Sequence, residues 1–99
     1  MPHNVQKNEA DIDGRVLYLS PPKQISEKLT IRTLVIEVFD NNWASPCPFV
    51  FKNARMDCLK DVVEGDWVNV QYKLSGFRGK GEGEVKYYAE NLGQNVIKA

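Results

Sequence analysis

Aromatic and basic side chains, rather than catalytic ones, are the residues of this sequence that could do chemistry. Phe49 and Phe51 are separated by one residue, and Trp43 precedes them. Phe77 lies in a glycine-rich stretch. An aromatic face can stack on another flat ring, and a lysine or arginine can bind a phosphate. For stacking and phosphate contact we consider Trp43, Phe49, Phe51 and Phe77, with Arg32, Lys52, Arg55, Lys73, Arg78 and Lys80.

No arrangement of residues indicates catalysis. His3 is the only histidine and lies in a polar N-terminal stretch, and no nucleophile stands beside a base. Cys47 and Cys58 lack the spacing of metal ligands. Acidic pairs could hold a metal, but solvated carboxylates at such spacings are common: Asp11 and Asp13, Asp57 and Asp61, Glu82 and Glu84. We therefore expect no enzyme activity, no metal and no cofactor.

The composition predicts one folded domain. Of 99 residues, 42% are hydrophobic and 26% are charged. We expect a flexible N-terminal segment at residues 1–10 and a single domain at residues 11–99. Lys+Arg and Asp+Glu both number 13, and this balance counts against nucleic-acid binding without excluding a local basic patch.

The sequence predicts a cytoplasmic protein without a membrane partner. It contains no apolar run of transmembrane length and no secretory signal. Two cysteines without a pairing pattern fit free thiols in a reducing compartment.

Alternation of apolar and polar residues predicts five strands. The clearest follows the turn Glu64-Gly65-Asp66, where Val68, Val70, Tyr72 and Leu74 share one face. Other strands are expected at residues 11–20, 30–40 and 47–52, and across 85–99 with a break or kink near Gly93. Residues 23–29 are interpreted as a polar connection and residues 75–84 as a flexible glycine-rich hairpin loop.

The faces of these strands decide which aromatics are exposed. In the first strand we place Ile12, Val16 and Tyr18 on one face, with Gly14 marking a bend. If Leu34, Ile36, Val38 and Val50 fill the interior, Phe49 and Phe51 face outward. A shift of one residue inverts this assignment and makes both rings core, and both assignments stay open. Trp43 likewise either contacts a ligand or packs at the bottom of the barrel.

A short helix is predicted between the third and fourth strands. Met56, Leu59, Val62 and Val63 recur at helical spacing, Asn53 can cap the helix, and Gly65 can end it. Strands and helix therefore follow in the order β-β-β-α-β-β. This order predicts an all-β fold, a five-stranded Greek-key OB-fold barrel with one short helix between strands 3 and 4.

The chain resembles OB-fold proteins of the single-stranded-DNA-binding type, and most closely a small family of uncharacterised bacterial proteins with that fold. The resemblance covers residues 11–99. The matching pieces are Gly14-Arg15-Val16, Leu34-Val35-Ile36-Glu37, Phe49-Val50-Phe51-Lys52, Asp57-Cys58-Leu59-Lys60-Asp61-Val62, Gly65-Asp66-Trp67-Val68-Asn69-Val70 and Gly76-Phe77-Arg78.

The resemblance implies sequence-tolerant binding of single-stranded DNA, with RNA as an alternative, in replication, recombination or repair. Bases would stack on outward aromatics of the second and third strands, and Lys and Arg would contact phosphates. Phe77 is the aromatic that packing explains least well.

The alternative function is an OB-fold protein-interaction subunit of a DNA-processing complex, since fold alone does not define function. The zero net charge favours this alternative. Exposed aromatics would also suit a homodimer or homotetramer.

Overall fold

Six strands and one 3₁₀ helix make up the computed structural model, which describes residues 9–79 and 83–99. In chain order they are β1 (Glu9–Leu19), β2 (Lys23–Ser26), β3 (Leu29–Asp40), β4 (Trp43–Lys52), η1 (Asn53–Leu59), β5 (Trp67–Arg78) and β6 (Tyr87–Lys98). Most of the predicted flexible segment and the candidate Lys80 lie outside the described residues. No helix in the described part of the chain is long and apolar enough to cross a membrane.

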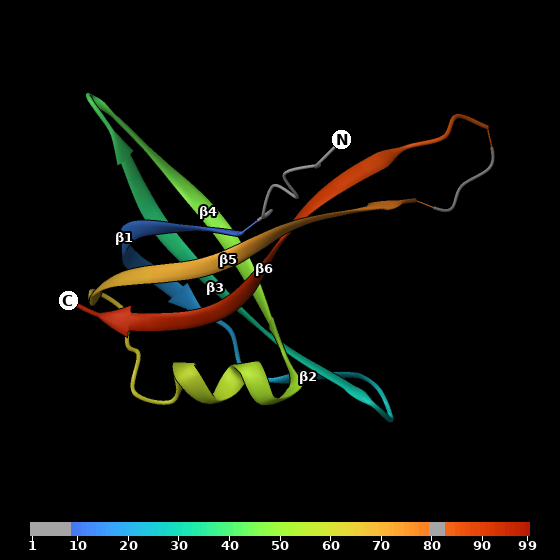
Figure 1. The fold of residues 1–99 in the computed structure, drawn as a ribbon, viewed down its shortest axis with the longest axis horizontal. Coiled ribbons are helices and arrows are strands. Elements are labelled where there is room, and N and C mark those ends of the chain that lie inside the picture. Colours follow the sequence, from blue (N-terminus) through green and yellow to red (C-terminus); the bar gives the residue numbers. More distant parts are fainter. Residues whose placement is uncertain (1–8, 80–82) are drawn as a thin grey trace, which may run out of the picture.

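The strands close into a barrel (Figure 1). Neighbours in the sheet follow the order β1-β5-β6-β4-β3-β2, and β1 also pairs with β3. The closed ring contains β1, β3, β4, β5 and β6, while β2 extends β3 at its outer edge. Among the described strands, only the contact of β4 with β6 is parallel, at Val50 and Leu92. The predicted all-β, five-stranded OB-type barrel is confirmed, with β2 added in the expected connection.

The first strand closes the barrel by changing partners. Glu9 to Arg15 pair with β5, and Arg15 to Leu19 pair with β3. At Gly14 a Cβ would lie 2.7 Å from the carbonyl oxygen of Glu37, so the close approach of the two strands requires glycine. Gly14 thus lies just before the point where β1 changes from β5 to β3, as expected for a strand that pairs with two neighbours.

A β-bulge follows Gly14 and corrects the predicted faces of the first strand. Val16 pairs with Ile36 and Tyr18 with Val35, so Leu17 is the extra residue. One extra residue reverses the alternation beyond it. Leu19 therefore packs against the core, whereas Tyr18 is turned outward and is 49% exposed.

Phe49 and Phe51 belong to the core, and their outward assignment is wrong. Their exposed fractions are 2% and 0%. Phe49 lies opposite Leu34 in the β3–β4 register, and residues opposite each other on paired strands share a face. The interior is therefore filled by both phenylalanines with seven aliphatic side chains: Val16, Leu34, Ile36, Leu59, Val62, Val68 and Val70.

Gly93 makes room for Phe51. A Cβ at this position would lie 2.2 Å from the Phe51 ring. Of the predicted break or kink near Gly93, the break is absent, since β6 continues through Gly93. A one-residue irregularity does fall beside it, where Gln71 pairs with Asn95 and Tyr72 with Gly93. The glycine thus serves core packing rather than ending the strand.

The helix closes one end of the barrel through buried Leu59, with Val62 buried just beyond it. It is a 3₁₀ helix that ends at Leu59, short of the predicted end at Gly65. Asn53 does not cap it. Instead Asn53 adopts a left-handed conformation with φ 50°, its Oδ1 accepts the N–H of Thr30 at 2.9 Å, and its Nδ2 donates to the carbonyl of Lys28 at 3.2 Å.

Candidate nucleic-acid interface

One face of the barrel exterior runs across β1, β3, β4 and β6. One row of this face contains Tyr18 on β1, Val35 on β3 and Pro48 on β4, which lie opposite one another. The next row contains Thr33, Val50 and Leu92, and it continues onto β5 at Lys73. We call the exterior surface of these residues, with Lys52 and Glu90, the outer face. Its apolar centre and flanking lysines suit contact with a chain of bases and phosphates.

The β5–β6 hairpin carries an aromatic pair that continues the outer face. Phe77 lies opposite Tyr88, and their rings stack with centroids 5.3 Å apart and planes 23° from parallel. Phe77 is 54% exposed and Tyr88 47% exposed. Side chains two positions apart on a strand share a face, so the pair lies on the same side as Ser75 and Glu90.

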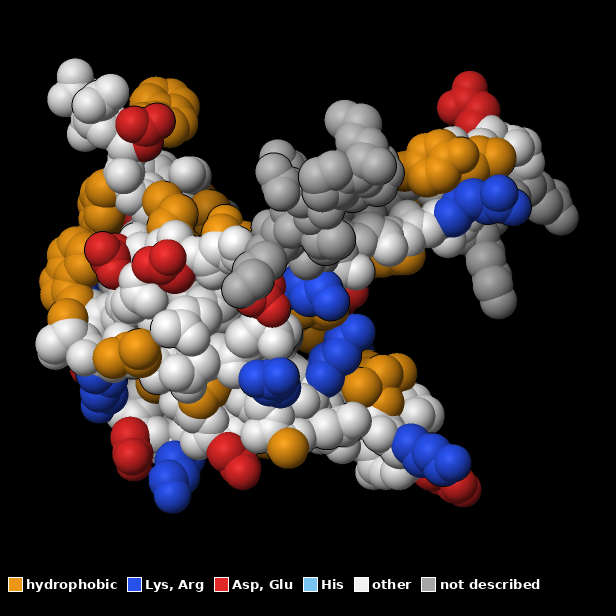
Figure 2. Space-filling model, viewed as in Figure 1, with side chains coloured by type: hydrophobic (Ala, Val, Ile, Leu, Met, Phe, Trp, Pro, Cys, Tyr) orange, Lys and Arg blue, Asp and Glu red, His pale blue; other side chains and the backbone are white. Residues whose placement is uncertain are grey.

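The hairpin projects away from the barrel body (Figure 1). Figure 2 shows a hollow between this hairpin and the β2–β3 end of the molecule, with lysine and arginine side chains along it. At Gly79 a Cβ would lie 2.5 Å from the Tyr88 ring, so glycine leaves room for the ring there. The hairpin therefore exposes the stacked rings of Phe77 and Tyr88, which we call the aromatic platform, near a hollow that lysine and arginine side chains line.

Among the predicted phosphate contacts, Lys52 and Lys73 lie on the outer face. Lys52 Nζ is 4.0 Å from Glu90 Oε2, which ties β4 to the base of the hairpin. Lys73 is exposed and lies opposite Glu9 and Leu92 in the registers of β5. Arg78, at the end of β5, is exposed on the opposite side of the hairpin from Phe77.

Arg32 and Arg55 have other roles in the described structure. Arg32 lies opposite Phe51 and so shares its inward side, and its Nε donates to the carbonyl of Ser20 at 2.7 Å. Arg55 donates from Nη1 to the carbonyl of Gln94 at 3.2 Å. The structure does not place either arginine on the outer face.

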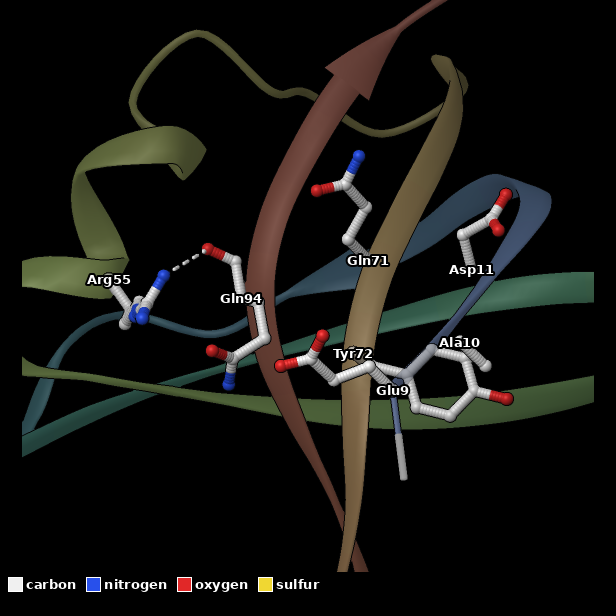
Figure 3. Close-up of a pocket in the computed structure, with 7 residues that line it drawn as sticks. All are labelled: Glu9, Ala10, Asp11, Arg55, Gln71, Tyr72 and Gln94. Carbon is white, nitrogen blue, oxygen red and sulfur yellow. Dashed lines mark hydrogen bonds between the residues drawn. The ribbon is translucent and has the colours of Figure 1, made fainter. Parts of the chain in front are cut away.

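Arg55 lines a polar pocket of about 440 Å³ (Figure 3). Arg55 and Gln94 lie at one side of the pocket and Asp11 at the other. The remaining lining residues are Glu9, Ala10, Gln71 and Tyr72. Two carboxylates face this space with one guanidinium, a charge balance that disfavours phosphate.

Trp43 lies at the tip of the β3–β4 hairpin and is 75% exposed. The alternative prediction that Trp43 packs at the bottom of the barrel is therefore wrong. This tip and the β5–β6 hairpin project in different directions (Figure 1).

A second aromatic pair, Phe39 and Trp67, has ring centroids 5.7 Å apart and is half exposed. The Arg15–Glu37 ion pair, at 3.0 Å, lies beside it in the strand registers.

Sequence reasoning missed Tyr18 and Tyr88 as candidates. Tyr88 follows Tyr87 at the start of β6, and both rings are exposed. The predicted loop at residues 75–84 hid the strand pairing of Tyr88, because β5 in fact continues to Arg78 and carries Phe77 opposite Tyr88. Tyr18 was hidden by the bulge, which single-sequence alternation does not show.

Two side chains outside the outer face have shifted proton affinities. Burial raises the pKa of the Cys58 thiol, which favours its protonated, unreactive form. The backbone N–H of Val63 and, next, the Lys98 ammonium lower the pKa of Asp66. Within residues 9–79 and 83–99, no three potential metal ligands gather.

Strand order, closure and the single helix between β4 and β5 define an OB-type barrel. No protein-family model matches the sequence, and no curated protein sequence matches it. The similarity to known proteins is structural.

Solved structures of single-stranded-DNA-binding proteins share this fold over nearly the whole chain. Mitochondrial Rim1 of S. cerevisiae superposes with a TM-score of 0.71 at 12% identity, covering 95% of this chain and 96% of that one. The SSB of Plasmodium falciparum, solved in complex with ssDNA, gives 0.71 at 15% identity, covering 100% and 99%. A small single-stranded DNA-binding protein from Streptomyces coelicolor gives 0.54 at 14% identity, covering 96% of each chain.

Proposed function

We propose that this protein binds single-stranded DNA without strong sequence preference, along the outer face and the β5–β6 hairpin. The observation that carries the proposal is the half-exposed stack of Phe77 on Tyr88, on the same side of the sheet as Lys52. A packed core would bury such a pair, whereas a nucleobase can extend the stack. The shared fold with DNA-binding proteins supports the same function.

In this mechanism, stacking supplies most of the affinity and phosphate contacts add to it. Each stacked base contributes about 1–3 kcal/mol and tolerates any sequence. Lys52 and Lys73 are the phosphate contacts on the outer face. Two full contacts would give a salt slope of about −1.4 in log K against log salt for a single strand, and this value is the upper limit for these two lysines. The zero net charge agrees with this small number of contacts.

The test is fluorescence anisotropy of labelled oligo-dT titrated with the protein at low and moderate salt. We expect saturable binding with a shallow salt slope. An oligo-rU titration tests RNA as the ligand, and double-stranded DNA is the control for mere charge attraction. Absence of oligo-dT binding at low salt, with protein well above micromolar, would reject the proposal.

The alternative is a protein-interaction subunit of a DNA-processing complex, and the Phe39–Trp67 pair favours it. These two half-exposed rings lie beyond the outer face on the same exterior side of the sheet, since Phe39 is four residues past Val35 on β3. Exposed aromatics are enriched at protein interfaces. A homodimer or homotetramer would bury the same pair. Sedimentation of wild type and Trp67→Ala separates these assemblies from a monomer.

The cellular setting that fits this function is replication or repair in a bacterial cytoplasm. The two free thiols, Cys47 and Cys58, suit a reducing compartment.

A further inference from the structure

We propose that Glu90 competes with DNA phosphate for Lys52 and thereby limits the affinity of the outer face. The inference rests on the proposed function, since it concerns the same surface. Glu90 Oε2 lies 4.0 Å from Lys52 Nζ, and Lys52 is the lysine nearest the middle of that face. Bound phosphate and this carboxylate would therefore need the same cation.

The position of Glu90 does not depend on Lys52. Glu90 is paired with Ser75 in the β5–β6 ladder. The next residue, Asn91, donates from Nδ2 to the carbonyl of Pro48 at 3.3 Å and fixes the hairpin base on β4 independently. The carboxylate therefore stays on the outer face when Lys52 turns toward a phosphate.

The surroundings of the pair make the competition effective. The side chains of Lys52 and Glu90 are 42% and 26% exposed, so both are partly shielded from water and salt. Tyr88, two residues before Glu90 on the same side, belongs to the aromatic platform. A strand stacked on that platform would bring phosphates near the carboxylate, and this repulsion adds to the loss of the ion pair.

The test compares Glu90→Gln, which removes the charge and keeps the shape, with wild type in oligo-dT titrations at several salt concentrations. We expect Glu90→Gln to bind roughly two- to five-fold more tightly. Its salt slope should be steeper by up to about 0.7, because Lys52 then acts as a full phosphate contact. Glu64→Gln, an equal charge change in the exposed turn before β5, is the matched control and should bind like wild type.

Lys52→Met supplies the second arm. In the Lys52→Met background, Glu90→Gln should lose most of its gain, because no lysine remains for the carboxylate to hold. The inference would be overturned if Glu90→Gln bound oligo-dT no more tightly than wild type. It would also be overturned if Glu90→Gln raised the affinity equally in the Lys52→Met background. Either result would leave the proposed function standing. If neither wild type nor any variant binds oligo-dT, the proposed function fails and this inference fails with it. The melting temperature of each variant is measured to verify that it is folded under the conditions of the titration.

Discussion

Phe77 and Tyr88 stack across the β5–β6 hairpin at a centroid distance of 5.3 Å, outside the barrel that buries the other candidate phenylalanines. The ladder holds the two rings opposite each other, so the platform is formed before any ligand arrives. Preorganised rings lose little conformational freedom on binding. This relationship moves the predicted stacking site from the third predicted strand to the hairpin.

Replacing Phe77 by Ala should weaken oligo-dT binding by about 1–3 kcal/mol, because one stacking surface is lost. The melting temperature should change little, since the ring is half exposed. Anisotropy titration and thermal denaturation measure the two effects. Phe39→Ala is the matched control, because Phe39 is similarly exposed, at 50% against 54%, and packs on Trp67 outside the Phe77–Tyr88 platform. Equal loss in both variants would contradict the assigned platform.

Replacing Phe51 by Ala should lower the free energy of unfolding by about 3–5 kcal/mol, since the ring is fully buried over Gly93. The folded fraction should bind oligo-dT with unchanged affinity. Urea denaturation gives the stability, and titration at low temperature gives the affinity. A stable variant with weakened binding would restore Phe51 to the interface.

Asn53→Ala should destabilise the protein by about 2 kcal/mol, because Ala loses both side-chain hydrogen bonds and keeps the left-handed backbone. Asn53→Gly should cost about 1 kcal/mol less, since glycine accepts positive φ without strain. Urea denaturation of the two variants distinguishes them. Equal stability of both would show that the backbone conformation at this residue carries no cost.

The stability contributed by Asp66 should disappear in acid. Its pKa is lowered in the folded state, first by the Val63 N–H and then by Lys98. The contribution is therefore fully present above the ordinary aspartate pKa of about 3.9 and is lost as pH falls through the lowered value. Asp66→Asn should be less stable than wild type at neutral pH, and this difference should shrink in acid. Thermal denaturation across pH measures it, and a difference independent of pH would contradict the assignment.

Much of the fold could be predicted because period-two alternation and turn residues are local signals. Val68 and Val70 after Gly65-Asp66 predicted β5, and Gly14 indicated a strand that pairs with two neighbours, as β1 does. The short β2 was missed because its four residues are all exposed and carry no apolar pattern. Asn53 was misassigned as a cap, because its partners Thr30 and Lys28 are distant in the sequence.

The sequence by itself determined that an all-β barrel forms, and it pointed to stacking and phosphate contact as the chemistry of this protein. Tertiary structure alone decided which aromatics are available. Residues 49–51 are apolar on both faces, so alternation cannot orient them, and the orientation came from pairing with Leu34 and from the space above Gly93. Likewise, Tyr88 faces Phe77 only through the register of the β5–β6 hairpin, which the alternation of residues within each strand does not reveal.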